Sequence, residues 1–341
     1  MVLIQNFHKI SKNTEYSIIK DFSRRTSTCK RTVDKFSNTK TTYISDFLSP
    51  TTSWQLDQAL SPYFKSSPDI SRFKRGSILP LGYNYLYFSR CEPEERLAKD
   101  GGDMVYTPSV EWVRRLWAKG SLEYMKKDTL WPLRMGYPAF CTETVEKIDN
   151  EYYKNNAIAI WTNKEIAPLD DKEQIKEIHL RERTCIVYQL EEKDGKKVLQ
   201  KQKKVGSHGL KTPTLTNIIK AWIPEFSISI TPSQILLFRY SALTFNAHKI
   251  HYDYSYLKEE KYENFVVQGS LSVILLLKLL RQHTSSHLNL KSFYYTIQRP
   301  LYANSTYKFC GRRLKKLSGT QYILWVESDN LLHIKGTAEM W

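Results

Sequence analysis

Two histidines, an asparagine and an aspartate lie close together in the segment from Phe245 to Asp253, FNAHKIHYD. Asn246, His248, His251 and Asp253 carry side chains that can move protons, donate hydrogen bonds or bind a metal ion. Imidazole titrates near neutral pH, so one histidine can serve as acid or base. A histidine at a helix end can also be packed or capped by its neighbours. The residue types and their spacing leave these interpretations open.

A metal site is the least favoured of them. The spacing H-x-x-H followed by Asp253 offers three ligands, but the H-E-x-x-H pattern of zinc proteases is absent. The five cysteines lie far apart and never form C-x-x-C, which disfavours both a structural zinc site and a disulfide framework. We therefore expect no metal and a reducing compartment.

The elements around this segment must position its side chains. Thr231-Pro232-Ser233-Gln234 is a capping-box pattern, which predicts a helix with Thr231 as N-cap that continues to about Tyr240. The stretch from Asn264 to Arg281 predicts a second helix, apolar on almost every face and therefore buried. Four strands are predicted after it, at Lys291–Gln298, Thr306–Cys310, Gln321–Glu327 and Leu331–Thr337, the last two joined by a turn at Asp329-Asn330. A buried helix followed by antiparallel strands indicates an α+β fold in which a sheet wraps the helix.

The remaining sequence is long enough for a second unit. With 341 residues, 41% of them hydrophobic, the chain can bury one large core or two of moderate size. Short helices are predicted from Ser45 to Lys65, a loop with a strand from Ser77 to Arg90, and further strands at 120–124, 157–161 and 183–190. The lysine-rich stretch from Glu191 to Gly209 is the clearest change of composition, so we place a domain boundary there.

Charge is the strongest feature of the composition. The net charge of +16 predicts attraction to polyanions, whether nucleic acid, an anionic lipid surface or an acidic protein. The longest apolar run, Leu271 to Leu280, is too short for a hydrocarbon core of ~30 Å and contains Lys278, so we expect no membrane span. Residues 1–45 form a basic tail rich in Ser and Thr, typical of an organellar presequence or of a disordered tail.

Several stretches resemble one family. SALTFNAHKIHYD (Ser241–Asp253), VVQGSLSVILLLKLL (Val266–Leu280) and YTIQRPLYANSTYKFCGR (Tyr295–Arg312) are similar to the MaoC-like hydratases and dehydratases of the hot-dog fold. GYNYLYF (Gly82–Phe88) and GGDMVYTPSVEWVRRLWAKGSLEY (Gly101–Tyr124) resemble the N-terminal unit of the same group. Within the family, the chain most resembles the fungal mitochondrial hydroxyacyl-thioester dehydratases of type 2.

The resemblance implies a double hot-dog chain, in which two antiparallel sheets each wrap a central helix. It implies a non-catalytic unit at 46–200 and a catalytic unit at 201–341. The activity would be that of a hydro-lyase, which removes water reversibly from (3R)-hydroxyacyl thioesters to give trans-2-enoyl thioesters. The substrates would be carried on acyl carrier protein or coenzyme A, without a further cofactor, in type II fatty acid synthesis of the mitochondrial matrix. Both a monomer and a homodimer are compatible with such a chain.

The resemblance also assigns residues. His251 matches the family's catalytic histidine, and Asn246 matches an asparagine that can hydrogen-bond the hydroxyl or a water. Gln268 and Gly269, at the start of the apolar helix, are the candidates for thioester binding, because unpaired N–H groups and the positive end of the helix dipole coincide there. Arg299-Pro300 matches a turn of the family.

One position departs from the family pattern. The family commonly has an aspartate two residues before the asparagine, and Thr244 stands there in this chain. A threonine cannot take up and release a proton as a carboxylate does. Three alternatives remain: His248 takes the second role, Asp253 orients His251, or one histidine and water carry the reaction. Asp253 could equally cap a short helix after Tyr254.

A basic run and two other functions complete the predictions. Arg312, Arg313, Lys315 and Lys316 form either a solvated loop or a docking site for a carrier protein or a phosphopantetheine phosphate. A basic mitochondrial RNA-binding protein is an alternative suggested by charge and 13% aromatic content, but no RNP-like, KH or zinc-finger signature supports it, so no nucleic acid is expected. A hot-dog thioesterase would use the same pocket with a different reaction.

Overall fold

The computed structural model describes residues 41–65, 69–109, 112–125, 132–149, 157–170, 172–190, 223–284, 289–314 and 320–341. Residues 1–40 of the basic tail predicted at 1–45, and the domain boundary expected near residue 200, lie outside the described residues. The last residues of that predicted tail, Thr42 to Ser45, belong instead to a strand.

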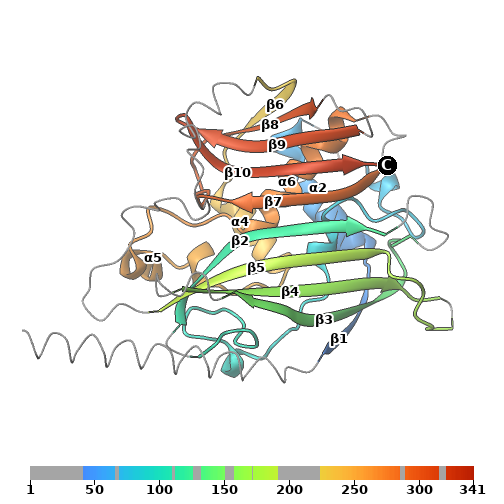
Figure 1. Ribbon diagram of the computed structural model, residues 1–341, viewed down its shortest axis with the longest axis horizontal. Helices are drawn as coiled ribbons and strands as arrows, with labels where there is room; N and C mark the ends of the chain where they lie inside the picture. Colours follow the sequence, from blue (N-terminus) through green and yellow to red (C-terminus); the bar gives the residue numbers. More distant parts are fainter. Residues whose placement is uncertain are drawn as a thin grey trace, which may run out of the picture.

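The strands form one antiparallel sheet, seen face-on in Figure 1. The first part of the chain contributes β1 (Thr42–Phe47), β2 (Trp112–Tyr124), β3 (Pro138–Asp149), β4 (Ala157–Pro168) and β5 (Leu180–Leu190). The second part contributes β6 (Phe226–Ile230), β7 (Leu290–Ile297), β8 (Tyr307–Leu314), β9 (Thr320–Ser328) and β10 (Leu331–Met340).

The two halves of the sheet repeat one strand order. The order across the ten described strands is β1-β3-β4-β5-β2-β7-β10-β9-β8-β6, so each half runs first, third, fourth, fifth, second from its outer edge. The second strands of the two halves, β2 and β7, pair at the centre, from Lys119 with Thr296 to Glu123 with Ser292. Two separate sheets were expected, and this pairing joins them into one.

The helices α2 (Pro50–Phe64), α4 (Gln234–Leu243) and α6 (Gly269–His283) lie behind the sheet in the view of Figure 1. Every residue of α6 from Leu271 to Leu280 is buried, as its apolar sequence predicts. A turn of the first half packs closely on it, because a Cβ on Gly82 would lie only 3.1 Å from Leu277. Within the described part of the chain, no helix has the length and apolar character needed to cross a membrane.

A sheet that covers a central helix is therefore found in the second half. In the first half, the described residues between α2 and β2 form only the short 3-10 turns η1 (Ile70–Arg72), η2 (Tyr83–Leu86) and η3 (Glu94–Arg96). The predicted strands at 120–124, 157–161 and 183–190 lie inside β2, β4 and β5, whereas β1, β3 and β6 were not predicted.

Two predicted helix starts differ from the structure. The N-cap of α4 is Ser233, whose Oγ accepts a hydrogen bond from Leu236 N at 3.1 Å, and the hydroxyl of Thr231 instead bonds that of Thr306. α6 begins at Gly269 rather than near Asn264 because the preceding residues pair with another segment: Val267 N donates to Leu301 O at 2.8 Å. The four strands predicted after α6 are confirmed as β7 to β10, and Asp329 and Asn330 both take positive φ in the last turn.

Candidate active site

The segment that carries the two histidines follows the C-terminal end of α4, which is capped by hydrogen bonds. The Thr244 hydroxyl donates to Tyr240 O at 2.8 Å, and Asn246 N donates to Ser241 O at 2.9 Å. Phe245, between them, takes a φ of 53°. The chain thus turns sharply, and the Thr244 hydroxyl is used within the helix end.

His251 ends the short 3-10 turn η5 (Lys249–His251) and is 7% exposed. Its Nδ1 lies 2.6 Å from Val266 O. A carbonyl oxygen only accepts hydrogen bonds, so Nδ1 carries the proton and Nε2 of the neutral ring keeps its lone pair. Burial, and to a smaller extent nearby His248, lower the pKa of His251 to about 3, and the bond to Val266 opposes this shift. His251 is therefore a neutral base at physiological pH.

His248 faces a carboxylate from the first half of the chain. Its Nε2 lies 3.2 Å from Oδ2 of Asp100, which is 6% exposed. Arg115 of β2 places its Nε 3.0 Å from the same oxygen, and Gly102 N donates to Oδ1 at 2.9 Å. Burial alone would raise the pKa of Asp100, but His248, Arg115 and the Gly102 N–H outweigh it and lower this pKa to about 2. Asp100 is thus ionised at neutral pH.

The two imidazole rings stand close together. The centroids of His248 and His251 are 5.6 Å apart, with the rings at 87° to each other. One ring is buried against a carbonyl oxygen, whereas the other contacts an ionised carboxylate. Two titratable groups in contrasting surroundings are the arrangement from which acid and base roles arise.

Asn246 and Asp253 both form local hydrogen bonds. Asn246 Oδ1 accepts from His248 N at 3.0 Å, which leaves the side-chain amide N–H groups as its donors. Asp253 Oδ1 accepts from Tyr256 N at 3.0 Å, so Asp253 is the N-cap of α5 (Tyr254–Glu260). The structure thus has the capping bond that was one of the two alternatives for Asp253.

The start of α6 lies three residues after the partner of His251. A Cβ on Gly269 would meet Trp117 Cγ of β2 at 2.7 Å, so only glycine fits without movement of that ring. The first bond of the helix is from Ser272 N to Gln268 O, and the N–H groups of Gly269 and Ser270 precede it. The Gln268 amide donates to Leu237 O and Ser241 Oγ, while its buried Oε1 has no hydrogen-bond partner among the described residues.

The predicted docking residues lie at the other end of α6. Phe226 pairs with Gly311 and stacks on His283, the last residue of α6, with ring centroids 4.5 Å apart. Arg312 and Arg313 follow Gly311 in β8, so the length of the helix, about 20 Å, separates them from Gly269. Lys315 and Lys316 are not among the described residues.

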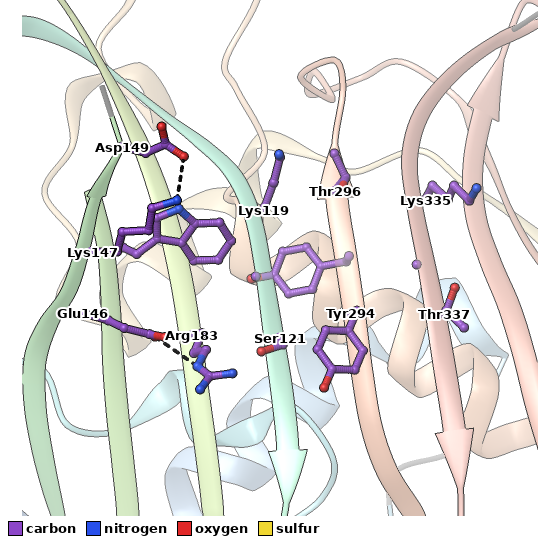
Figure 2. A pocket seen from close by; sticks show the side chains of 14 residues that line it. Lys119, Ser121, Glu146, Lys147, Asp149, Arg183, Tyr294, Thr296, Lys335 and Thr337 are labelled. Atoms are coloured by element: carbon purple, nitrogen blue, oxygen red, sulfur yellow. Dashed lines mark hydrogen bonds and ion pairs between the residues drawn. The ribbon is translucent and has the colours of Figure 1, made fainter. Parts of the chain in front are cut away.

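A cleft lies on the opposite face of the sheet. It has about 630 Å³ and is lined by outward side chains of the central strands, including Lys119, Ser121, Tyr294, Thr296 and Thr337 (Figure 2). Ion pairs bridge its wall, Lys147 with Asp149 at 3.1 Å and Arg183 with Glu146 at 3.0 Å. None of the candidate catalytic residues lines it. The described residues contain no group of three His, Cys, Asp or Glu side chains suited to a metal ion.

Sequence reasoning missed Asp100, Arg115 and Trp117. The signal that could have found the first is the Asp-Gly-Gly sequence at 100–102, because a glycine pair often marks a close backbone approach. Gly101 has a φ of 79°, and a Cβ there would lie 2.0 Å from Ala247 O, next to His248.

Comparisons with known proteins concern the family and the fold. A family model described as hydroxyacyl-thioester dehydratase type 2 matches residues 82–303. The chain is 28% identical over 286 residues to the mitochondrial hydroxyacyl-thioester dehydratase type 2 of Schizosaccharomyces pombe, across 78% of this chain and 88% of that protein. It is also 28% identical to the mesaconyl-C(4)-CoA hydratase of Chloroflexus aurantiacus, across 75% and 83% of the two chains. The crystal structure of a MaoC-like dehydratase from Phytophthora capsici has a similar fold, with a TM-score of 0.60, 15% identity and coverage of 91% and 97%.

Proposed function

The chain belongs to the hydroxyacyl-thioester dehydratase type 2 family, and on this premise we propose that it removes water reversibly from (3R)-hydroxyacyl thioesters. The product is the trans-2-enoyl thioester. The observation that carries the proposal is the buried, neutral His251, whose Nδ1 bonds Val266 O three residues before α6 and whose Nε2 keeps its lone pair. Such a group can take a proton from the carbon next to a thioester.

The second histidine supplies the acid. His251 Nε2 takes the α-proton as the C–H bond breaks, and protonated His248 gives a proton to the departing hydroxyl as the C–O bond breaks. The products are the enoyl thioester, water, a protonated His251 and a neutral His248, and exchange with solvent restores both histidines. In the hydration direction the roles reverse. The Asn246 amide hydrogen-bonds the hydroxyl or the water.

The start of α6 holds the thioester. The enolate-like oxygen that forms during proton removal needs hydrogen-bond donors. The N–H groups of Gly269 and Ser270 precede the first bond of the helix, where the helix dipole also favours negative charge. The Trp117 ring fills the space where a Gly269 side chain would stand, so the thioester reaches these N–H groups beside that ring. The buried Gln268 Oε1, which has no hydrogen-bond partner among the described residues, is an acceptor next to them.

The finer assignments follow from the family and the strand order. The repeated order of the two half-sheets supports a double hot-dog chain in which the second half holds α6. The mitochondrial relative and the basic N-terminal tail support a mitochondrial matrix enzyme of type II fatty acid synthesis. Its substrates are thioesters of acyl carrier protein or coenzyme A.

An assay on the purified full chain tests the function. A (3R)-hydroxyacyl-coenzyme A and the matching carrier-protein thioester are supplied, and the enoyl thioester is followed by its absorbance. In parallel, a thiol reagent detects any free thiol. Enoyl thioester without free thiol supports the dehydratase. Free thiol without enoyl thioester identifies a thioesterase instead. If neither enoyl thioester nor free thiol forms, the proposal is refuted.

A further inference from the structure

Asp100 belongs to another segment of the chain, and its carboxylate contacts the proposed catalytic loop that carries His248. The two segments that meet are the turn at 100–102 and the loop before η5. Lys249 N donates to the backbone oxygen of Asp100 at 2.7 Å, and Gly101 lies against Ala247. This backbone contact fixes the distance between the Asp100 side chain and His248.

Asp100 is itself held on three sides. Its Oδ1 accepts from Gly102 N at 2.9 Å and from Arg115 Nη2 at 3.2 Å, and its Oδ2 faces Arg115 Nε at 3.0 Å. Arg115 is fixed in turn, because its Nη1 donates to Asp103 O at 2.7 Å. His248 Nε2 lies 3.2 Å from Oδ2, a buried atom that has no hydrogen bond among the described residues.

We propose that Asp100 is a positioning residue that replaces the carboxylate missing at Thr244. The catalytic role in this assignment, unlike the contact itself, rests on the proposed function. A carboxylate only accepts hydrogen bonds, so we expect His248 to present Nε2–H to this unsatisfied oxygen and to turn Nδ1 away from it. The negative charge of Asp100 stabilises positive charge on His248 whenever that ring takes a proton. The catalytic site thus spans both halves of the chain, and the first half is not only a scaffold.

Asp100→Asn tests this role because it keeps the shape and removes the charge. We expect kcat for dehydration to fall about 10²-fold, within the range for acid–base groups, with a smaller change in KM. Glu260→Gln is the matched control, since Glu260 pairs with the neighbouring Arg114 at 2.8 Å across the same junction. We expect this control to retain kcat.

A double-mutant cycle separates positioning from general damage. If Asp100 acts through His248, Asp100→Asn has almost no further effect on kcat in a His248→Gln chain. An equal loss in both backgrounds, or a normal kcat in Asp100→Asn alone, overturns the proposal.

A spectroscopic measurement keeps the test independent of activity and of the variant's folding. In wild-type protein with ¹⁵N-labelled histidine, the His248 ring is expected to carry its proton on Nε2 when neutral. A neutral ring with the proton on Nδ1 overturns the pairing. An inactive wild-type enzyme with the Nε2 tautomer would instead refute the proposed function and leave the pairing intact.

Discussion

The Nδ1 atom of His251 lies 2.6 Å from the carbonyl oxygen of Val266, three residues before the first residue of α6. This bond sets the tautomer of the ring and ties the catalytic loop to the helix start. The proposed base and the proposed thioester donors are therefore held by one short stretch of backbone.

Replacing this histidine removes the proposed base. We expect His251→Gln to lower kcat for dehydration by about 10² to 10⁴-fold, the usual contribution of a general base. His283→Gln is the matched control, because His283 lies at the other end of α6 and stacks on Phe226. Enoyl thioester formation is measured for both, with circular dichroism as a check of folding. Turnover of His251→Gln close to wild type would remove His251 from the site.

The buried His251 also makes stability depend on pH. Its pKa is about 3 in the folded chain and about 6.5 in the unfolded chain, so between these values the unfolded chain binds a proton that the folded chain does not. Stability therefore falls on acidification, by about 1.4 kcal/mol per pH unit from this one group. Asp100 adds a loss at lower pH, as its carboxylate becomes protonated between about 3.8 and about 2.

Urea unfolding of wild type and His251→Gln at pH 6, 5 and 4 measures this slope. Burial also lowers the pKa of His179, to about 4, and that of His333, and both histidines are common to the two proteins. The difference in slope then isolates His251, and the variant's slope should be smaller by about one proton. Identical slopes would mean that His251 is not buried in its neutral form.

Local patterns in the sequence predicted much of the second half. The apolar run of α6 and the Asp329-Asn330 turn depend on neighbouring residues, so they are readable without the fold. The Asp100–His248 contact depends on how a turn of the first half approaches the loop after α4, and no local pattern encodes that distance. The same limit explains why α6 begins later in the sequence than predicted: the residues before Gly269 pair with a distant segment, Val267 with Leu301.

Asp253 gives a test of capping against catalysis. Its Oδ1 accepts from Tyr256 N, a bond that asparagine can also make. We expect Asp253→Asn to keep both kcat and stability, and Asp253→Ala to lose about 1 kcal/mol of stability. Kinetics and urea unfolding of the two variants provide the measurement. A large loss of kcat in Asp253→Asn would show that the negative charge serves the reaction.

The basic residues of β8 give a test of carrier docking. Arg312 and Arg313 lie about one helix length from Gly269, so a carrier bound there must reach the site with its long prosthetic arm. We expect Arg312→Glu/Arg313→Glu to raise KM for a carrier-protein thioester several-fold and to leave KM for the coenzyme A thioester unchanged. Added salt should act in the same selective way. Equal changes for the two substrates would assign these arginines to a solvated strand end.

A buried ion pair on the far part of α6 joins the two halves of the chain. Lys278 Nζ contacts Asp57 Oδ1 of α2, and Tyr83 OH donates to the same oxygen at 2.8 Å. Lys278 is 5% exposed and Asp57 is 7% exposed. Burial lowers the pKa of Lys278, and Asp57 opposes that shift. The pair is thus costly to break, because either partner alone would leave a buried charge.

We expect Lys278→Met to lower the free energy of unfolding by about 3 to 5 kcal/mol, since Asp57 would remain buried without its cation. The double variant Lys278→Met/Asp57→Asn should recover most of this loss, because asparagine has no charge and still accepts from Tyr83. Urea unfolding of the wild type, both single variants and the double variant measures the coupling. Additive losses would show that the two side chains do not stabilise each other.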